Sequence, residues 1–244
     1  MSGAFRKIDV AQGAMREIMC SRYALWAVDD LEGRFLIVDP TIGFRSHFNI
    51  APRSENPVVV SAEGRNRIRQ MRWGLVPGWA KEGQTMPRPV NARAETLSEK
   101  PMFRQLLVEN RCLVPANGFY EWKTEGTRKI PFFFHRPDNA LFSFAGLYDT
   151  WLSPAGETLV SYTIITTSTN ELMAQVHDRM PVVLAREGEE RWLSPVTRSP
   201  DELMEVLVPC ANDVLEVHAV SQRVNRPGKD DGGMILPVNG RGMV

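Results

Sequence analysis

The segments ALFSFAGLY (Ala140–Tyr148) and TLVSYTIIT (Thr158–Thr166) are rich in β-branched and aromatic residues. Pro154 and Gly156, which lie between them, are typical turn residues, so each segment predicts a β-strand. The same composition, bounded by Gly, Pro, Asn or Asp, recurs in both directions along the chain. It predicts further strands at Arg34–Val38, Pro57–Ser61, Ile68–Val76, Pro131–His135 and Val214–Val220.

Helical patterns are fewer and shorter than the strand patterns. In one of them Phe103, Leu106 and Leu107 stand at helical spacing, and in another Ser199 precedes a proline at the first helical position. The predicted helices are Pro101–Asn110, Asn170–Val176, Arg186–Leu193 and Pro200–Leu207. Strands and helices do not alternate regularly. We therefore expect a strand-rich α+β fold in a single domain, with mixed or antiparallel β-sheets and a few short helices.

The composition is that of a globular protein. The chain has 244 residues, of which 43% are hydrophobic and 24% charged, and no run of apolar residues is long enough to span a membrane. Lys and Arg together number 29, as do Asp and Glu, so the formal net charge is zero. A nucleic-acid site on this protein must therefore be a local basic patch, and its affinity should depend only modestly on salt.

Cysteine and histidine are sparse. The three cysteines have no CxxC spacing, and the four histidines show no HExxH pattern. We therefore expect no disulfide and no metal or other cofactor, and we expect the protein to be a cytoplasmic monomer.

The pair Met19-Cys20 stands between a polar segment, Met1–Ile18, and the first strand-like residues. If translation begins at Met19 and that Met is removed, Cys20 carries a free α-amine beside its thiol. Such an aminothiol condenses with an aldehyde to a Schiff base, and the thiol then closes a five-membered thiazolidine. Both groups titrate near enough to neutrality to react. The alternative is an inert, buried thiol.

Four other motifs contain candidate functional residues. An extended segment would place Asn91, Arg93 and Glu95 on one face, as a phosphate or carboxylate clamp or as a solvated ion pair at a strand edge. Glu121 stands among aromatic residues. If it is buried, the pKa of its carboxyl rises, as suits a general acid, whereas the alternative is a carboxylate that reaches solvent. His177 is a candidate acid or base or a structural residue.

The fourth motif, Met71–Trp79, combines arginine with aromatic and proline residues, and Phe48–Pro52 precedes it. This pattern fits a groove for single-stranded nucleic acid, in which Trp79 and Trp122 offer faces for bases. It fits a packed corner of a barrel as well.

Together the motifs resemble those of the SRAP family, the SOS-response-associated peptidases. The resemblance runs in order from Met19 to Val238. It rests on Met19–Arg22, Asn49–Pro52, Met71–Ala80, Asn91–Thr96, Arg111–Trp122, His177–Pro181 and the closing Val220–Val238 segment. Ser21 stands where the family usually has glycine.

The resemblance implies a role in the DNA damage response. Such proteins bind single-stranded DNA that carries an abasic site and form a thiazolidine DNA–protein crosslink through an N-terminal cysteine. By this resemblance Cys20 is the nucleophile, Asn91 positions it, Glu121 is the general acid/base and His177 assists proton transfer. The implied DNA contacts are Arg22 and Arg93 to phosphates, and Pro52, Trp79 and Trp122 to bases.

The resemblance also divides the chain into an extension (1–18), an SRAP domain (19–238) and a flexible tail (239–244). The extension blocks the amine of Cys20 when present. We expect a misassigned start site, with proteolytic removal or a binding-only protein as alternatives. On DNA, the protein would be nucleoid-associated.

Two other functions use the same residues. The first is a thiol peptidase or autoprotease, a hydrolase rather than a lyase, with Cys20 as nucleophile and His177 as base. The second is a non-catalytic module that binds single-stranded DNA. In a protein that only binds DNA, replacing Cys20 with Ala leaves function intact. In a crosslinking protein, the same replacement abolishes the covalent chemistry.

Overall fold

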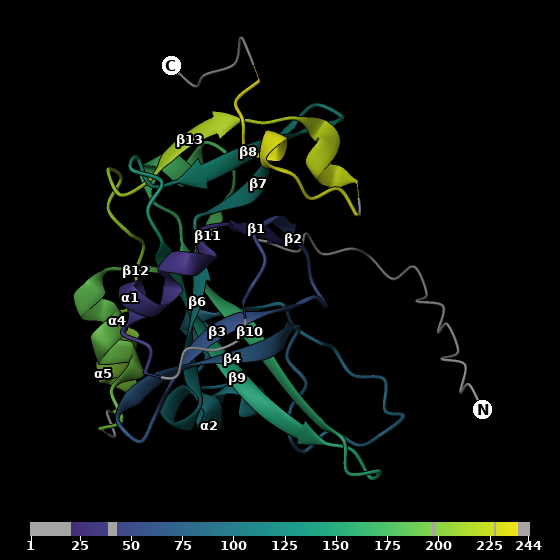
Figure 1. The fold of residues 1–244 in the computed structure, drawn as a ribbon, viewed down its shortest axis with the longest axis vertical. Helices are drawn as coiled ribbons and strands as arrows, with labels where there is room; N and C mark the ends of the chain where they lie inside the picture. Colours follow the sequence, from purple (N-terminus) through teal and green to yellow (C-terminus); the bar gives the residue numbers. More distant parts are fainter. Residues whose placement is uncertain (1–20, 39–42, 197–198, 227, 239–244) are drawn as a thin grey trace.

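Two β-sheets, one above the other in Figure 1, form the body of the protein. The structure is a computed structural model and describes residues 21–38, 43–196, 199–226 and 228–238. Sheet A has five strands and sheet B has eight within this part of the chain. No helix in the described ranges is long and apolar enough to cross a membrane.

Sheet A is antiparallel throughout and joins strands from distant parts of the chain. Its order is β13 (Glu216–Ala219), β8 (Arg128–His135), β7 (Gly118–Glu125), β1 (Arg22–Leu25) and β2 (His47–Ile50).

Sheet B contains a closed ring of strands. The ring runs through β10 (Thr158–Ser168), β4 (Arg65–Trp73), β3 (Glu55–Ala62), β6 (Arg111–Ala116) and β9 (Phe142–Leu152), and β9 pairs again with β10. Three short strands attach to it: β11 (Arg179–Pro181), β12 (Val183–Leu184) and β5 (Asn91–Arg93). β10 pairs in parallel with β4 and β5, whereas its other partners are antiparallel. The fold is therefore a strand-rich α+β domain with a closed barrel, as the sequence predicts.

The main hydrophobic core lies between sheet A and the barrel. Tyr23 and Phe119 of sheet A pack edge-on against Phe144 of sheet B, with ring centroids 6.0 and 5.8 Å apart. These residues define the inner face of sheet A. Alternation along the strands sends Tyr120 and Phe133 to the outer face, where they form a second, smaller cluster.

The helices are short and lie around the barrel (Figure 1). They are α1 (Leu31–Phe35), α2 (Pro101–Glu109), α3 (Glu171–Ala174), α4 (Arg186–Leu193) and α5 (Pro200–Met204). The described residues also form four 3-10 turns: η1 (Val28–Asp30), η2 (Ala94–Thr96), η3 (Gln222–Asn225) and η4 (Gly232–Met234). All four predicted helices are confirmed in position, and Ser199 caps α5 in a capping box with Glu202.

One predicted strand is wrong. Arg34–Val38 begins inside the helix α1, whose Leu31 and Phe35 are buried four residues apart, on one helical face. The helix ends at Leu36, which has a left-handed φ of 52°, and Ile37 forms only an isolated bridge with Asn66.

Candidate active site

Glu121 is held in the interior by strand β7. It pairs across the sheet with Phe132 and shares the inner face with Phe119. The residue is 3% exposed, so the alternative in which its carboxylate reaches solvent is wrong. Its carboxyl group therefore lies inside the protein.

The start of β1 lies beside Glu121. Arg22, the first residue of β1, pairs with Tyr120, the neighbour of Glu121 on β7. The description of the chain begins at Ser21. Cys20 lies outside the described residues, so its role stays a prediction.

Asn91 and Arg93 share one face of β5, which pairs in parallel with β10. The predicted extended segment stops there, because Ala94–Thr96 turns into a 3-10 helix that carries Glu95. Glu95 therefore does not continue the strand face, and this part of the prediction is wrong. Arg93 is exposed, whereas Asn91 is half-buried.

His177 lies just after α3, and its side chain is 14% exposed. Its Nδ1 accepts a hydrogen bond from the backbone N–H of Arg179 at 3.2 Å, and the carboxylate of Asp178 lies 2.8 Å from the same nitrogen. Nδ1 therefore faces a donor and an acceptor at once, and the ring is held between the Arg179 backbone and the Asp178 carboxylate.

A forked ion pair links the segments that carry Asn91 and His177. The Arg179 guanidinium donates to both carboxylate oxygens of Glu95, at 2.5 and 2.8 Å, and to the carbonyl of Thr166 on β10 at 2.9 Å. The sequence did not reveal this pair, since its partners are 84 residues apart. Arg179 stands two residues after His177, and this proximity in the sequence is the signal that could have pointed to it.

The Glu95–Arg179 pair makes stability depend on acid pH. The hydrogen bond from Arg179 holds the pKa of the Glu95 carboxyl below its ordinary value of 4.5. The stabilisation is therefore present above the unfolded pKa and lost as the pH falls through the lower folded value. Since Glu95 is half exposed, we expect Glu95→Gln to cost at most about 1 kcal/mol at pH 7. Urea unfolding at pH 7 and pH 3 measures this, and a cost that persists at pH 3 would contradict it.

Arg22 and Trp122 lie on the outer face of sheet A, opposite Glu121. Arg22 donates to Asn49 Oδ1 at 2.9 Å and to a backbone carbonyl at 3.0 Å, and Trp122 Nε1 donates to Asn225 Oδ1 at 2.8 Å. Burial lowers the pKa of the Arg22 guanidinium. Both side chains anchor the C-terminal segment, and their DNA contacts stay predictions.

The predicted nucleic-acid residues Pro52 and Trp79 lie in two loops that are joined to the end of β4. The turn containing Pro52 is fixed by two backbone bonds, from Arg53 N to the carbonyl of Trp73 and from Trp73 N to the carbonyl of Ser54. The loop containing Trp79 follows β4 directly. Pro52 is half-buried, whereas Trp79 is 60% exposed.

The loop around Trp79 is fixed although its side chain is free to stack. Gly78 N donates to Asp149 Oδ2 at 2.7 Å, and Trp151 Nε1 donates to the carbonyl of Ala80 at 2.6 Å. A Cβ at Gly78 would lie 2.8 Å from the carbonyl of Thr150, so glycine permits the close approach. An exposed indole on such a loop is a preformed stacking surface.

We expect Trp79→Ala to weaken binding of single-stranded DNA by about 5- to 100-fold, because one stacked base contributes about 1–3 kcal/mol. Its unfolding free energy should change by less than about 0.5 kcal/mol, since the side chain is exposed. Fluorescence anisotropy with a labelled oligonucleotide measures the affinity. The matched control is Leu152→Ala, an equally exposed apolar residue. If both variants lose the same amount of DNA affinity, Trp79 is not part of the DNA interface.

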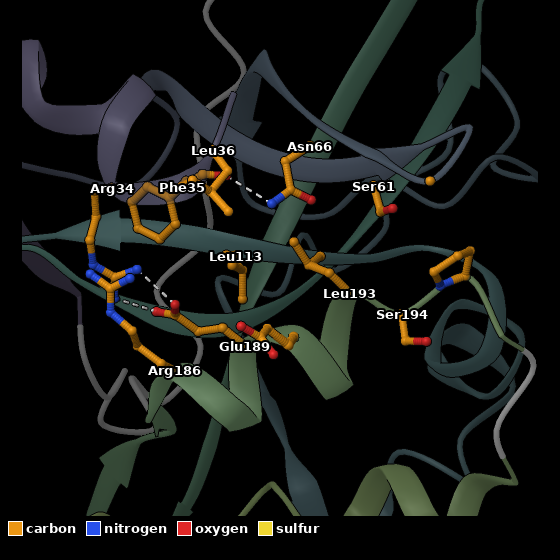
Figure 2. A pocket seen from close by; sticks show the side chains of 13 residues that line it. Arg34, Phe35, Leu36, Ser61, Asn66, Leu113, Arg186, Glu189, Leu193 and Ser194 are labelled. Carbon is orange, nitrogen blue, oxygen red and sulfur yellow. Dashed lines mark hydrogen bonds and ion pairs between the residues drawn. The ribbon is translucent and has the colours of Figure 1, made fainter. Parts of the chain in front are cut away.

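A separate hollow of about 220 Å³ lies between α1 and α4 (Figure 2). None of the candidate site residues lines it. Arg34 and Glu189 meet there in a two-pronged ion pair, with both contacts 2.8 Å long. Across the described ranges, no group of three or more His, Cys, Asp or Glu side chains is placed to hold a metal ion.

Comparisons with known proteins agree with this fold and these motifs. The chain is 43% identical over 213 residues to the abasic site processing protein YoaM of Bacillus subtilis. This match covers 86% of this chain and 94% of that protein. It is 33% identical over 227 residues to the abasic site processing protein HMCES of Gallus gallus. This match covers 80% of this chain and 67% of that protein.

Solved structures give the same result. A crystal structure of a protein from Bacteroides thetaiotaomicron superimposes with a TM-score of 0.83 at 28% identity, covering 90% of this chain and all of that one. The family model described as SOS response associated peptidase (SRAP) matches residues 19–227. With its motifs, its fold and its relatives in agreement, the chain belongs to the SRAP family.

Proposed function

We propose that this protein processes abasic sites in single-stranded DNA by capturing the sugar aldehyde covalently through Cys20. The observation that carries the proposal is the buried Glu121 beside the start of β1, in a chain 43% identical to a protein named for abasic site processing. Cys20 directly precedes Ser21, the first described residue, in the sequence.

The proposed chemistry needs no outside reagent. The α-amine of Cys20 adds to the C1′ aldehyde of the opened sugar, and loss of one water gives a Schiff base. The thiol sulfur then adds to the carbon of the C=N bond, and its proton passes to the nitrogen as the thiazolidine closes. The product has the mass of protein plus DNA minus one water.

Two side chains supply the proton transfers in this proposal. Glu121 protonates the departing oxygen, first as the sugar ring opens and then as water leaves. Its burial suits the role, since a general acid must hold its proton near neutral pH. His177 exchanges a proton with the same intermediates, whereas Asn91 orients the amine.

The proposed DNA contacts combine exposed cations with stacking groups. Arg93 and Trp79 are exposed and free to meet phosphates and bases. Because the formal net charge is zero, only a few phosphates are neutralised, and the affinity should fall gently with salt.

Intact-mass spectrometry tests the proposal. The chain is produced from Met19, so that Met removal exposes Cys20, and is mixed with an oligonucleotide carrying one abasic site. We expect a heat-stable product at protein plus oligonucleotide minus water, and none with Cys20→Ala or with residues 1–18 attached. If Cys20 is confirmed at the terminus and no product forms, the crosslinking function is wrong. Cleavage of a peptide by the longer chain would instead favour a thiol peptidase.

A further inference from the structure

The outer face of sheet A contains a pocket of about 370 Å³. It lies on the opposite side of the sheet from Glu121, because Phe133 pairs with Tyr120 whereas Glu121 pairs with Phe132. The residues that line it are Trp26, Phe133, His135, Asn139, His218, Ile235, Leu236 and Pro237. None of them has a role in the proposed crosslinking chemistry.

Aromatic rings form the wall of this pocket. Phe133 stacks on His135 with ring centroids 5.6 Å apart and planes 17° apart, and His218 meets His135 edge-on at 5.1 Å. Trp26 lies 6.3 Å from Phe133. Gly118 makes this arrangement possible, since a Cβ there would lie 2.2 Å from the Phe133 ring. Walls of this kind favour a flat, apolar-faced ligand.

Two histidine nitrogens give the pocket its polar character. His135 Nδ1 lies 2.8 Å from the carbonyl of Arg136, and His218 Nε2 lies 2.8 Å from the carbonyl of Ile235. A carbonyl only accepts, so each of these nitrogens carries the proton. In the neutral rings Nε2 of His135 and Nδ1 of His218 are then acceptors. No hydrogen bond within the described part of the chain uses either atom, although His135 is 91% buried.

The surroundings disfavour the charged form of His218. Burial lowers the pKa of His218, and the neighbouring His135 acts in the same direction. No Lys or Arg lines the pocket, so a phosphate would find no partner there. Two imidazoles without a third metal-binding side chain also fall short of a metal site.

We infer that this pocket binds a nucleobase that carries an exocyclic amino group. The ring of the base stacks on the aromatic wall formed by Phe133 and His135. Its amino group donates hydrogen bonds to the free nitrogens of His135 and His218. The base comes either from a free nucleoside or from a DNA strand whose phosphates stay in solvent, and the chemistry of recognition is the same.

Isothermal titration calorimetry of the full chain tests this inference with two nucleosides. Adenosine carries the amino group, whereas purine riboside has the same ring without it. We expect saturable binding of adenosine that is about five- to tenfold tighter than binding of purine riboside, the contribution of one or two hydrogen bonds. Equal affinities, or no saturable binding, would overturn the inference. This readout does not involve Cys20, so it fails or succeeds independently of the crosslinking function.

Variants locate the binding and identify its source. His218→Phe keeps a ring but removes one of the two acceptors, so it should weaken adenosine binding toward that of purine riboside. Val208→Ala, an exposed position outside the pocket, should leave the affinity unchanged. An oligo-dT strand containing one dA that displaces adenosine identifies DNA as the source, and failure to displace it identifies a free nucleoside. If His218→Phe binds adenosine as tightly as the unaltered chain, the site is elsewhere.

Discussion

Glu121→Gln is expected to slow covalent capture of an abasic site by about 10²- to 10⁴-fold, the usual contribution of a general acid. Gln keeps the shape of Glu121 and its place among buried side chains but has no acidic proton to give. Ring opening of the sugar and loss of water from the first adduct both need that proton. The affinity for the unreacted oligonucleotide should stay within about twofold, because Gln keeps the size of Glu121 and its ability to form hydrogen bonds.

Single-turnover kinetics at saturating protein measure the effect, with the adduct separated on a denaturing gel. Glu125→Gln is the matched control, since Glu125 lies on the same strand and its side chain is half exposed. Comparable rates for Glu121→Gln and the unaltered chain would exclude the general-acid role. A change in affinity alone would instead assign Glu121 to DNA positioning.

Glu189→Ala is expected to reduce the free energy of unfolding by about 3 kcal/mol or more, the usual cost of breaking a buried ion pair. The Glu189 side chain is only 8% exposed. It accepts two hydrogen bonds from Arg34 and one from Ser143 Oγ at 2.7 Å. Removing the carboxylate leaves the guanidinium, among the described residues, with the carbonyl of Leu141 at 3.2 Å and the ring of Phe35 at 4.5 Å, and neither carries a compensating charge.

Urea unfolding followed by tryptophan fluorescence measures this loss. The adjacent Glu190 is exposed, and Glu190→Ala should cost less than about 0.5 kcal/mol. Replacing both partners, as Arg34→Met with Glu189→Leu, should recover most of the stability, because no buried charge is then left alone. A loss below about 1 kcal/mol for Glu189→Ala would show that water enters the hollow and solvates Arg34.

The strands that sequence reasoning found are those with a visible composition signal. Thr158–Thr166 is confirmed inside β10, and Pro57–Ser61 inside β3. β6 was missed as a strand because all six of its residues are buried and the segment contains Pro115, so it shows neither alternation nor an unbroken β-forming run. The closure of the barrel through β9 and β10 depends on register, which one sequence does not reveal.

The site was predictable in its residue types but not in its arrangement. The sequence allowed Glu121 to be either buried or in contact with solvent, and the structure shows that it is buried. The Glu95–Arg179 pair was hidden, because two surface-type residues far apart in sequence give no periodic signal. The resemblance implies DNA contacts for Arg22 and Trp122, and these contacts stay predictions. Which face of sheet A the two residues occupy could not be predicted, because the pairing with β7 sets it.

The position of β1 in sheet A also constrains folding during synthesis. β1 pairs with β7, almost a hundred residues later, so the first strand stays without that partner until the middle of the chain has left the ribosome. Contacts of such sequence separation form slowly, because a long loop must close first. β1 is therefore open to other strand partners on the nascent chain until β7 has been synthesised. The yield of correctly folded protein should then depend on how quickly translation delivers β7.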